Sequence, residues 1–136
     1  MSAFVSTLKV ASESFDRNRQ DMLSLLDGYH EIKQRAVGLS AKRKPRFDER
    51  GQLLPRERLL RLLDPGMPFL EMYGLASFLV DTPDREKSVA GASNLAGIGF
   101  ISGVRSFVMV DDSGINAGAA TPKTGEKIQA CLDVAL

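Results

Sequence analysis

The chain has 136 residues, 43% of them hydrophobic and 26% charged, with a formal net charge of +1. This composition is typical of a globular domain and excludes a disordered tail, and no apolar run reaches the roughly 18 residues of a membrane span. No secretion signal or transit peptide is visible and the single cysteine, Cys131, excludes an internal disulfide, so we expect a cytoplasmic protein, or one of the mitochondrial matrix in a eukaryote.

The charge is unevenly distributed along the chain. Residues 1–63 hold thirteen Lys and Arg against eight Asp and Glu, a balance of +5, and residues 64–136 hold five against nine, a balance of −4. The most basic stretch runs from Lys42 to Arg46. Because no aromatic interleaving or recognition-helix pattern accompanies it, we interpret it as a solvated face and expect no nucleic-acid partner. Phosphate groups of a small ligand would nevertheless be attracted to it.

A first amphipathic helix is predicted over Ser12–Val37, where apolar residues recur at helical spacing: Phe15, Met22, Leu25, Leu26, Tyr29, Ile32 and Ala36. His30 is the only histidine and shares this helix with no second histidine or cysteine, so we expect a surface residue and no metal site. The following Gly38–Gly51 stretch is polar, basic and interrupted by Pro45, which predicts a linker.

A second, short helix is predicted after Leu53, with Pro55 in its first turn and a sharp stop at residues 64–66, which are Asp, Pro and Gly. Its leucines predict one apolar stripe: Leu59, Leu60, Leu62 and Leu63. The polar side keeps three arginines, for which we expect structural ion pairs with Glu57, Asp64 or another subunit: Arg56, Arg58 and Arg61.

Strands are predicted beyond this helix. Phe69–Tyr73 and Leu75–Val80 are apolar and aromatic enough for two strands, and a charged loop follows. Leu95–Ile101 and Val104–Val110 flank a Ser-Gly pair, which predicts a tight hairpin. The glycines at 97 and 99 indicate that one face of the first hairpin strand lies close to other backbone.

After the hairpin the chain forms a small-residue loop and a final helix from Pro122 or Lys123 onward. A strand, a tight loop and a helix start in this order are a common ligand site in α/β proteins, although such a loop can equally turn a corner and nothing more. Neither a nearby histidine nor a Gly-x-Ser-x-Gly elbow accompanies the preceding polar residues, so turn and cap roles are expected for Asp111, Asp112 and Ser113. The last turn lacks a stop signal, which suggests a chain cut in mid-fold.

Three stretches together resemble the carboxyltransferase (β) subunits of biotin-dependent acyl-CoA carboxylases, and most of all the methylcrotonyl- and geranyl-CoA carboxylase branch. The first runs from Leu54–Arg58 to Asp64–Glu71, the second is Gly97–Gly99, and the third is the hairpin together with the loop that follows it. The resemblance covers about residues 10–136. It implies an α/β (α+β) chain with a partial crotonase-like (ClpP/crotonase) fold: N-terminal helices, then strands, a hairpin and a terminal helix. Residues 1–52 would be an N-terminal helix and basic linker, and residues 53–136 the truncated start of the carboxyltransferase N-terminal domain.

The resemblance also implies an activity. A carboxyl group would pass from carboxybiotin, carried by a biotin carboxylase/biotin carrier (α) subunit, to an acyl-CoA such as 3-methylcrotonyl-, geranyl- or propionyl-CoA, in a homo-oligomer of β subunits without a metal. The backbone amides of three loop residues would contact the acyl-CoA, and two lysines one helical turn apart would face its phosphates: Gly118, Ala119, Ala120, Lys123 and Lys127. The family's Asp-Ser-Gly-Gly-Ala oxyanion segment would follow Leu136, so no catalytic residue is expected here and the chain alone would be inactive.

The loop departs from the family pattern. Asn116 and Ala117 stand where the family often has Lys-Gly, and Ala120 and Thr121 stand where an aromatic pair is usual. These differences leave the acyl group unassigned. Two other interpretations remain open: a non-catalytic CoA- or nucleotide-binding module, and an interaction domain that docks a partner through its first helix.

Overall fold

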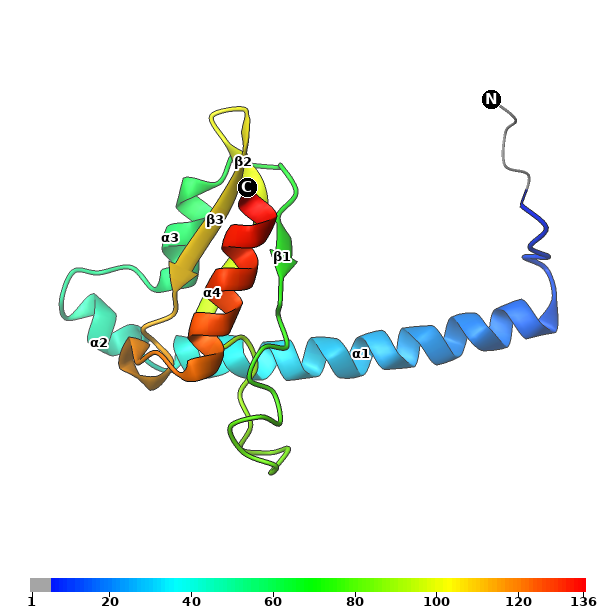
Figure 1. Cartoon of the computed structure of the whole chain (residues 1–136), viewed down its shortest axis with the longest axis horizontal. Coiled ribbons are helices and arrows are strands. Elements are labelled where there is room, and N and C mark those ends of the chain that lie inside the picture. The colour runs from blue at the N-terminus through cyan, green and yellow to red at the C-terminus, as the bar shows by residue number, and fades with distance from the viewer. Residues whose placement is uncertain (1–5) are drawn as a thin grey trace. The chain divides into compact units, whose positions relative to one another are not determined.

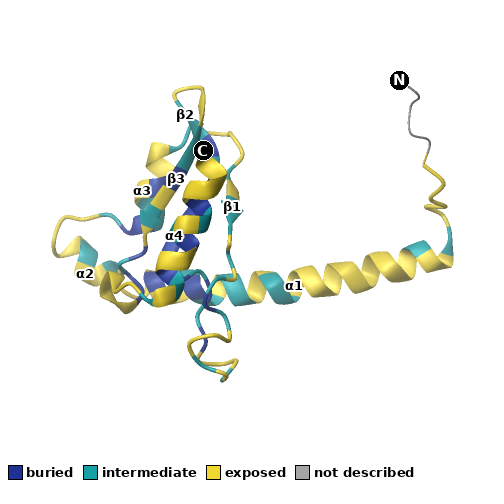
Figure 2. Ribbon diagram, viewed as in Figure 1, coloured by how far each residue is buried: buried dark blue, intermediate teal, exposed yellow. Residues whose placement is uncertain are grey.

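The computed structural model describes residues 6–136, and the chain divides into two compact units, one ending at Glu31 and one covering Ile32–Leu136. Helix α1, Glu13–Ala41, passes from one to the other. In the first unit, Ser12 Oγ accepts a hydrogen bond from the Phe15 amide and caps the helix. Most of its surface is exposed (Figure 2), including the apolar side chains of Met22, Leu23, Leu25 and Leu26, with Leu25 at 70%. His30 is exposed beside the Tyr29 ring, which confirms the predicted surface position.

The predicted linker over Gly38–Gly51 is wrong, because the second unit is helical there. Helix α1 continues to Ala41, and a short helix α2 spans Lys44–Asp48. Pro45 lies in the first turn of α2, where a missing backbone N–H costs nothing. The proline that predicted a break therefore starts a helix, and the compact unit includes this basic segment.

Helix α3, Pro55–Leu62, forms where predicted, and the Glu57 carboxylate accepts a hydrogen bond from the Leu54 amide at 2.9 Å. The predicted leucine stripe is only partly correct. Leu59 is buried, whereas Leu60 and Leu62 are 74% and 46% exposed. A helix of two turns presents one narrow face to the core, which Leu59 and, beyond the helix end, Leu63 occupy.

The sheet has three antiparallel strands in the order β1-β2-β3: Leu70–Met72, Asn94–Ile101 and Val104–Asp111. Ile101 pairs with Val104, and Ser102 and Gly103 between them have φ of 52° and 78°. Two successive left-handed residues are the geometry of a type I′ turn, whose twist matches that of the strands. The predicted hairpin is confirmed.

The second predicted strand, Leu75–Val80, is wrong. This segment forms successive turns, with hydrogen bonds such as Phe78 N to Leu75 O at 3.0 Å. Positive φ at Ser77 and Leu79 is incompatible with extended backbone. Its backbone instead bonds to residues farther along the chain: Leu79 N donates to Ser88 Oγ at 2.6 Å, and Ala76 O accepts from the Gly91 and Ala92 amides.

The core of the second unit lies between α3 and the sheet. Leu59, Leu95 and Val108 form its buried centre, and half-buried apolar residues surround it: Leu63, Phe69, Ile101 and Val110. A Cβ at Gly97 would lie 2.7 Å from Phe69 Cζ and collide with the Leu70 carbonyl. The predicted close approach at the strand glycines is confirmed. Helix α4, Pro122–Ala135, contacts β2, so that α3 and α4 flank the hairpin (Figure 1).

Asp64, at the end of α3, fastens this helix to the hairpin. Its carboxylate accepts hydrogen bonds from the Ser102 and Gly103 amides, both at 2.7 Å, and its own amide donates to Phe100 O at 2.8 Å. The residue that predicted a helix stop thus also satisfies the turn amides of the hairpin.

We expect Gly97→Ala to lower the free energy of unfolding by about 1–3 kcal/mol, because the added methyl group meets backbone that cannot move aside. Gly125→Ala is the matched control. Position 125 lies in α4 with no atom within 4 Å of an added Cβ, so this change should stabilise the chain by about 1 kcal/mol. Urea unfolding followed by circular dichroism measures both, and equal effects would contradict the packing described.

Asp64→Ala should lower the free energy of unfolding by about 2 kcal/mol, since two turn amides lose a charged acceptor. Asp133→Ala serves as control, because the Asp133 carboxylate accepts only from the exposed Gln129 side chain. In the same urea titration, the free energy of unfolding should change little for the control. A loss at position 64 no larger than at position 133 would show that the turn does not depend on the carboxylate.

Candidate functional site

The small-residue loop is open to solvent. It runs from Asp112 to the start of α4 and contains a short 3₁₀ turn, η1, at Asn116–Gly118. Asn116, Ala117 and Gly118 have φ of 47°, 54° and 79°, an unusual run of left-handed backbone. Residues 116–120 are all exposed, so among residues 6–136 no side chain covers this stretch.

Two of the three predicted amide contacts are already used inside the loop. The Gly118 amide donates to Ile115 O at 2.9 Å, and the Ala119 amide to Asn116 O at 3.0 Å. Within residues 6–136, the Ala120 amide has no acceptor. Of the three predicted contacts, a ligand that approaches this loop therefore finds only the Ala120 amide free, flanked by small side chains.

The two predicted lysines differ in their surroundings. Lys123 is half-buried in the first turn of α4 and pairs with Glu126. Lys127 is 3% exposed, and its ammonium donates to Gly91 O at 3.1 Å and to Asn94 O at 2.5 Å. Lys127 therefore anchors α4 to β2 and does not share a solvent face with Lys123. The CoA-binding role of these residues stays a prediction, with Lys123 the more accessible of the two.

Burial shifts two titratable groups on the inner face of α4. It lowers the pKa of Lys127, an effect that the nearby Glu71 carboxylate partly opposes. It also raises the pKa of the Cys131 thiol, which has no exposed surface. A neutral, enclosed thiol is a poor nucleophile, so Cys131 acts as a packing residue.

A buried carboxylate holds the start of the loop. Asp112 is 1% exposed; its Oδ1 accepts from Ser40 Oγ at 2.6 Å and from the Gly114 amide at 3.1 Å. Its Oδ2 lies 3.7 Å from Arg56 Nε, and neither atom has a hydrogen-bond partner. The turn role predicted for Asp112 is confirmed. The expected partner of Arg56 was wrong, because it pairs with Asp112 and not with Glu57 or Asp64.

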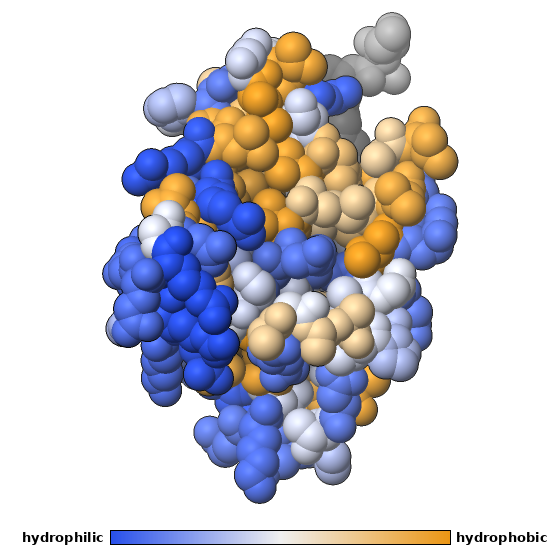
Figure 3. Space-filling model, turned by 90° about the vertical axis from the view of Figure 1, so that its left-hand side faces the viewer, coloured by the Kyte–Doolittle hydropathy of each residue, from blue (hydrophilic) through white to orange (hydrophobic). Residues whose placement is uncertain are grey.

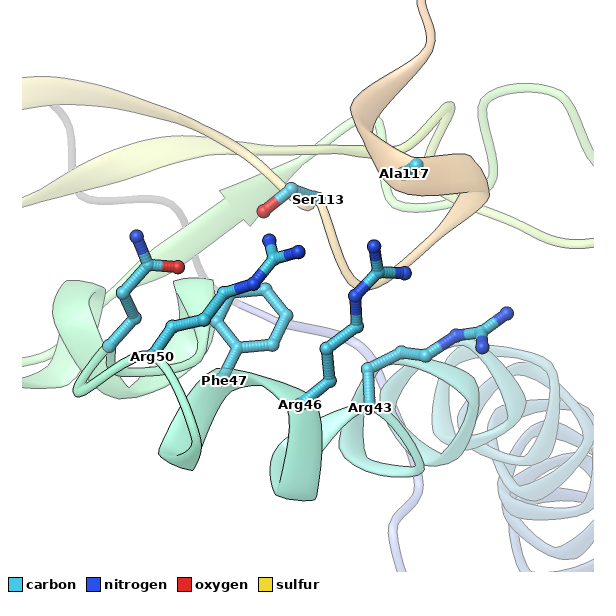
Figure 4. Close-up of a pocket in the computed structure, with 7 residues that line it drawn as sticks. Arg43, Arg46, Phe47, Arg50, Ser113 and Ala117 are labelled. Carbon is cyan, nitrogen blue, oxygen red and sulfur yellow. The ribbon is translucent and has the colours of Figure 1, made fainter.

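Beside this loop lies a basic hollow of about 180 Å³, which we call the arginine pocket. It is lined by Arg43, Arg46, Phe47, Arg50, Gln52, Ser113 and Ala117. Figure 4 shows Arg46 and Arg50 extending from the segment around α2 toward the loop that carries Ser113 and Ala117, with Arg43 beside them. A neighbouring cavity of about 430 Å³ shares Phe47, Gln52 and Ser113 and adds Arg58.

The arginines of this pocket are unpaired. Among the described residues, no carboxylate forms an ion pair with Arg43, Arg46 or Arg50. Lys44 differs, because it pairs with Asp48 and Glu57, and the hydrogen bond to Asp48 raises the pKa of Lys44. In Figure 3 hydrophilic surface gathers at the level of α2, whereas hydrophobic surface gathers above it, at the level of α3 and the hairpin. The pocket thus offers permanent positive charge without a built-in counterion.

Our sequence analysis noted the basic stretch but interpreted it as a solvated face. The signal that could have identified the pocket is spacing, because Arg43, Arg46 and Arg50 recur at i, i+3 and i+7, with Phe47 between them. That signal was hidden by Pro45, which led us to predict a linker. Within residues 6–136, no cluster of three or more His, Cys, Asp and Glu could hold a metal ion, and no helix is long and apolar enough to cross a membrane.

Comparison with known proteins gives a consistent result. Residues 47–136 match the carboxyl transferase domain family. The biotin-dependent 3-methylcrotonyl-coenzyme A carboxylase beta1 subunit of Mycobacterium tuberculosis is 38% identical over 104 residues, which cover 74% of this chain and 18% of that protein. The probable biotin-dependent acyl-coenzyme A carboxylase beta2 subunit of the same organism is 33% identical over 124 residues, 90% of this chain and 22% of that protein.

Solved structures agree on the fold. The crystal structure of the P. aeruginosa geranyl-CoA carboxylase beta subunit matches with a TM-score of 0.86 and 41% identity, over 98% of this chain and 25% of that one. Transcarboxylase 12S, described as a hexamer assembly, matches with a TM-score of 0.67 at 23% identity, over 83% of this chain and 22% of that one, and this likeness shows the fold alone. The predicted partial crotonase-like fold is confirmed. The chain spans about a quarter or less of the length of these relatives.

The buried Lys127 gives a prediction about pH. Its folded-state pKa lies below the ordinary 10.5, so between the two values the unfolded chain binds more protons and stability rises with pH. The difference in unfolding free energy between the wild type and Lys127→Met should therefore grow in favour of the wild type from neutral pH to about 10.5. Urea titrations across this range measure it, with the exposed Lys87→Met as control. A difference independent of pH would mean that Lys127 keeps its ordinary pKa.

Proposed function

We propose that this chain, which belongs to the carboxyl transferase family, forms part of the carboxyltransferase subunit of a biotin-dependent acyl-CoA carboxylase. There it helps to hold the acyl-CoA. The observation that carries this proposal is the match to the geranyl-CoA carboxylase beta subunit, with 41% identity over 98% of the chain. The matched region covers nearly the whole chain and therefore includes the loop and the helix that our proposal uses. It favours this function over a non-catalytic binding module or a helix-led interaction domain.

In this proposal the open loop contacts the acyl-CoA. The Ala120 amide is a free donor, and the absence of a side chain at Gly118 leaves room beside it. Lys123, three residues after Ala120 in the first turn of α4, supplies a cation that a ligand phosphate would share with Glu126. Preorganised backbone donors of this kind stabilise oxyanions because they need no reorientation during the reaction. The role of this chain is therefore to bind and orient the thioester-bearing ligand.

The transferred carboxyl group comes from carboxybiotin, which a partner subunit carries, and biotin supplies it as an activated carboxylate. The arginine pocket does not fit the neutral ring system of biotin, so we assign no residue of this chain to that cofactor. The acceptor is an acyl-CoA of the methylcrotonyl-, geranyl- or propionyl-CoA type. Assembly with further copies of the β subunit and with a biotin-carrying α subunit belongs to the same proposal.

The experiment is a calorimetric titration of the 136-residue chain with CoA. We expect binding, and a several-fold weaker affinity for Lys123→Gln, because a cation near the ligand is lost. Lys9→Gln is the control, as Lys9 is exposed in the other unit. Incubation with carboxybiotin and the candidate acyl-CoA substrates should give no carboxylated product from this chain alone. A titration without heat of binding, or turnover by the chain alone, would overturn the proposal.

A further inference from the structure

We propose that the arginine pocket binds the phosphate groups at the nucleotide end of the CoA, through Arg43, Arg46 and Arg50. This inference rests on the proposed function and specifies which part of the ligand this region takes. It assigns a specific ligand group to a basic segment that we first interpreted as a solvated face able to attract phosphate groups.

The charge of the pocket is the first argument. Guanidinium groups stay protonated at any physiological pH, and in the described part of the chain none of these three is neutralised by a carboxylate. Like charges that share a small hollow repel each other unless an anion lies between them. Lys44, next in sequence, lacks this property because Asp48 and Glu57 already pair with it. The arginines are thus free for a ligand that carries several negative charges.

The geometry is the second argument. The three arginines line the α2 side of the hollow, and Arg46 and Arg50 extend toward the loop that carries Ser113 and Ala117 (Figure 4). Guanidinium groups donate parallel pairs of N–H bonds, which match the oxygens of a phosphate. The half-buried Phe47 ring lies among them and offers an aromatic surface to an adenine base. An anion with an attached planar base therefore fits better than a simple inorganic ion.

Continuity with the loop is the third argument. Ala117 lines the arginine pocket and belongs to the same loop as the Ala120 amide. A CoA whose phosphates lie in the pocket can therefore extend along the loop toward Ala120. The neighbouring cavity, which shares Phe47, Gln52 and Ser113, enlarges the hollow to a size ordinary for a ligand site.

The test is calorimetry on the 136-residue chain with four probes: CoA, 3′-dephospho-CoA, adenosine 3′,5′-bisphosphate and pantetheine. The variant is Arg46→Gln combined with Arg50→Gln, both exposed positions where folding should be unaffected. Arg61→Gln is the matched control, because Arg61 is also exposed but lies outside the pocket. Thermal unfolding checks that all variants fold alike.

We expect adenosine bisphosphate to bind the wild type and the control equally, and the double variant at least about tenfold more weakly, because charged hydrogen bonds are lost. The affinity for CoA should fall likewise, and that for pantetheine should not change. CoA binding with the same affinity in the wild type and the double variant would overturn this inference but leave the proposed function intact. No CoA binding by the wild type would overturn both. A single-stranded oligonucleotide that binds more tightly than adenosine bisphosphate would also overturn the inference, since the basic surface would then serve nucleic acid.

Discussion

The buried carboxylate of Asp112 joins three segments that are distant in the sequence. It accepts hydrogen bonds from Ser40, near the end of α1, and from Gly114 in its own turn, and it faces Arg56 in α3. An ionised carboxylate away from water is costly unless such partners are kept. The loop after β3 must therefore leave the sheet at a fixed place. Because α2 begins only four residues after Ser40, both walls of the arginine pocket are positioned by this one group.

The contact between the loop and Ser40 also explains why residue 114 is a glycine. A Cβ at Gly114 would lie 2.9 Å from Ser40 Cα, so the loop and α1 approach as closely as backbone allows. Farther along, Lys127 holds α4 against the start of β2 by donating hydrogen bonds to the Gly91 and Asn94 carbonyls. Between these two anchors the exposed stretch from Asn116 to Ala120 has little packing of its own. A loop fixed at both ends and open in the middle can keep its amide donors available to a ligand.

The sequence predicted those features that depend on neighbouring residues. Alternation around a Ser-Gly pair predicted the hairpin, and a proline followed by leucines and Asp-Pro-Gly predicted α3, because turn and cap chemistry acts over a few residues. It failed where the deciding partner is distant. The i, i+4 spacing of Lys123 and Lys127 could not show that docking on β2 buries only the second. Nor could the Leu75–Val80 run reveal that its backbone bonds to Ser88, Gly91 and Ala92 farther along the chain.

The candidate site shows the same division between local and distant information. The basic stretch from Lys42 to Arg46 indicated an attraction for phosphate groups, but neither the net charge of +1 nor this stretch showed that a hollow forms there. What concentrates the charge is folding, which lets Asp48 and Glu57 neutralise Lys44 while Arg43, Arg46 and Arg50 remain unpaired around one hollow. A local potential of this kind attracts a charged ligand whatever the net charge of the chain. The helix that contains Pro45 therefore matters because it places these arginines on one side of the hollow. A count of charges along the sequence cannot show this placement.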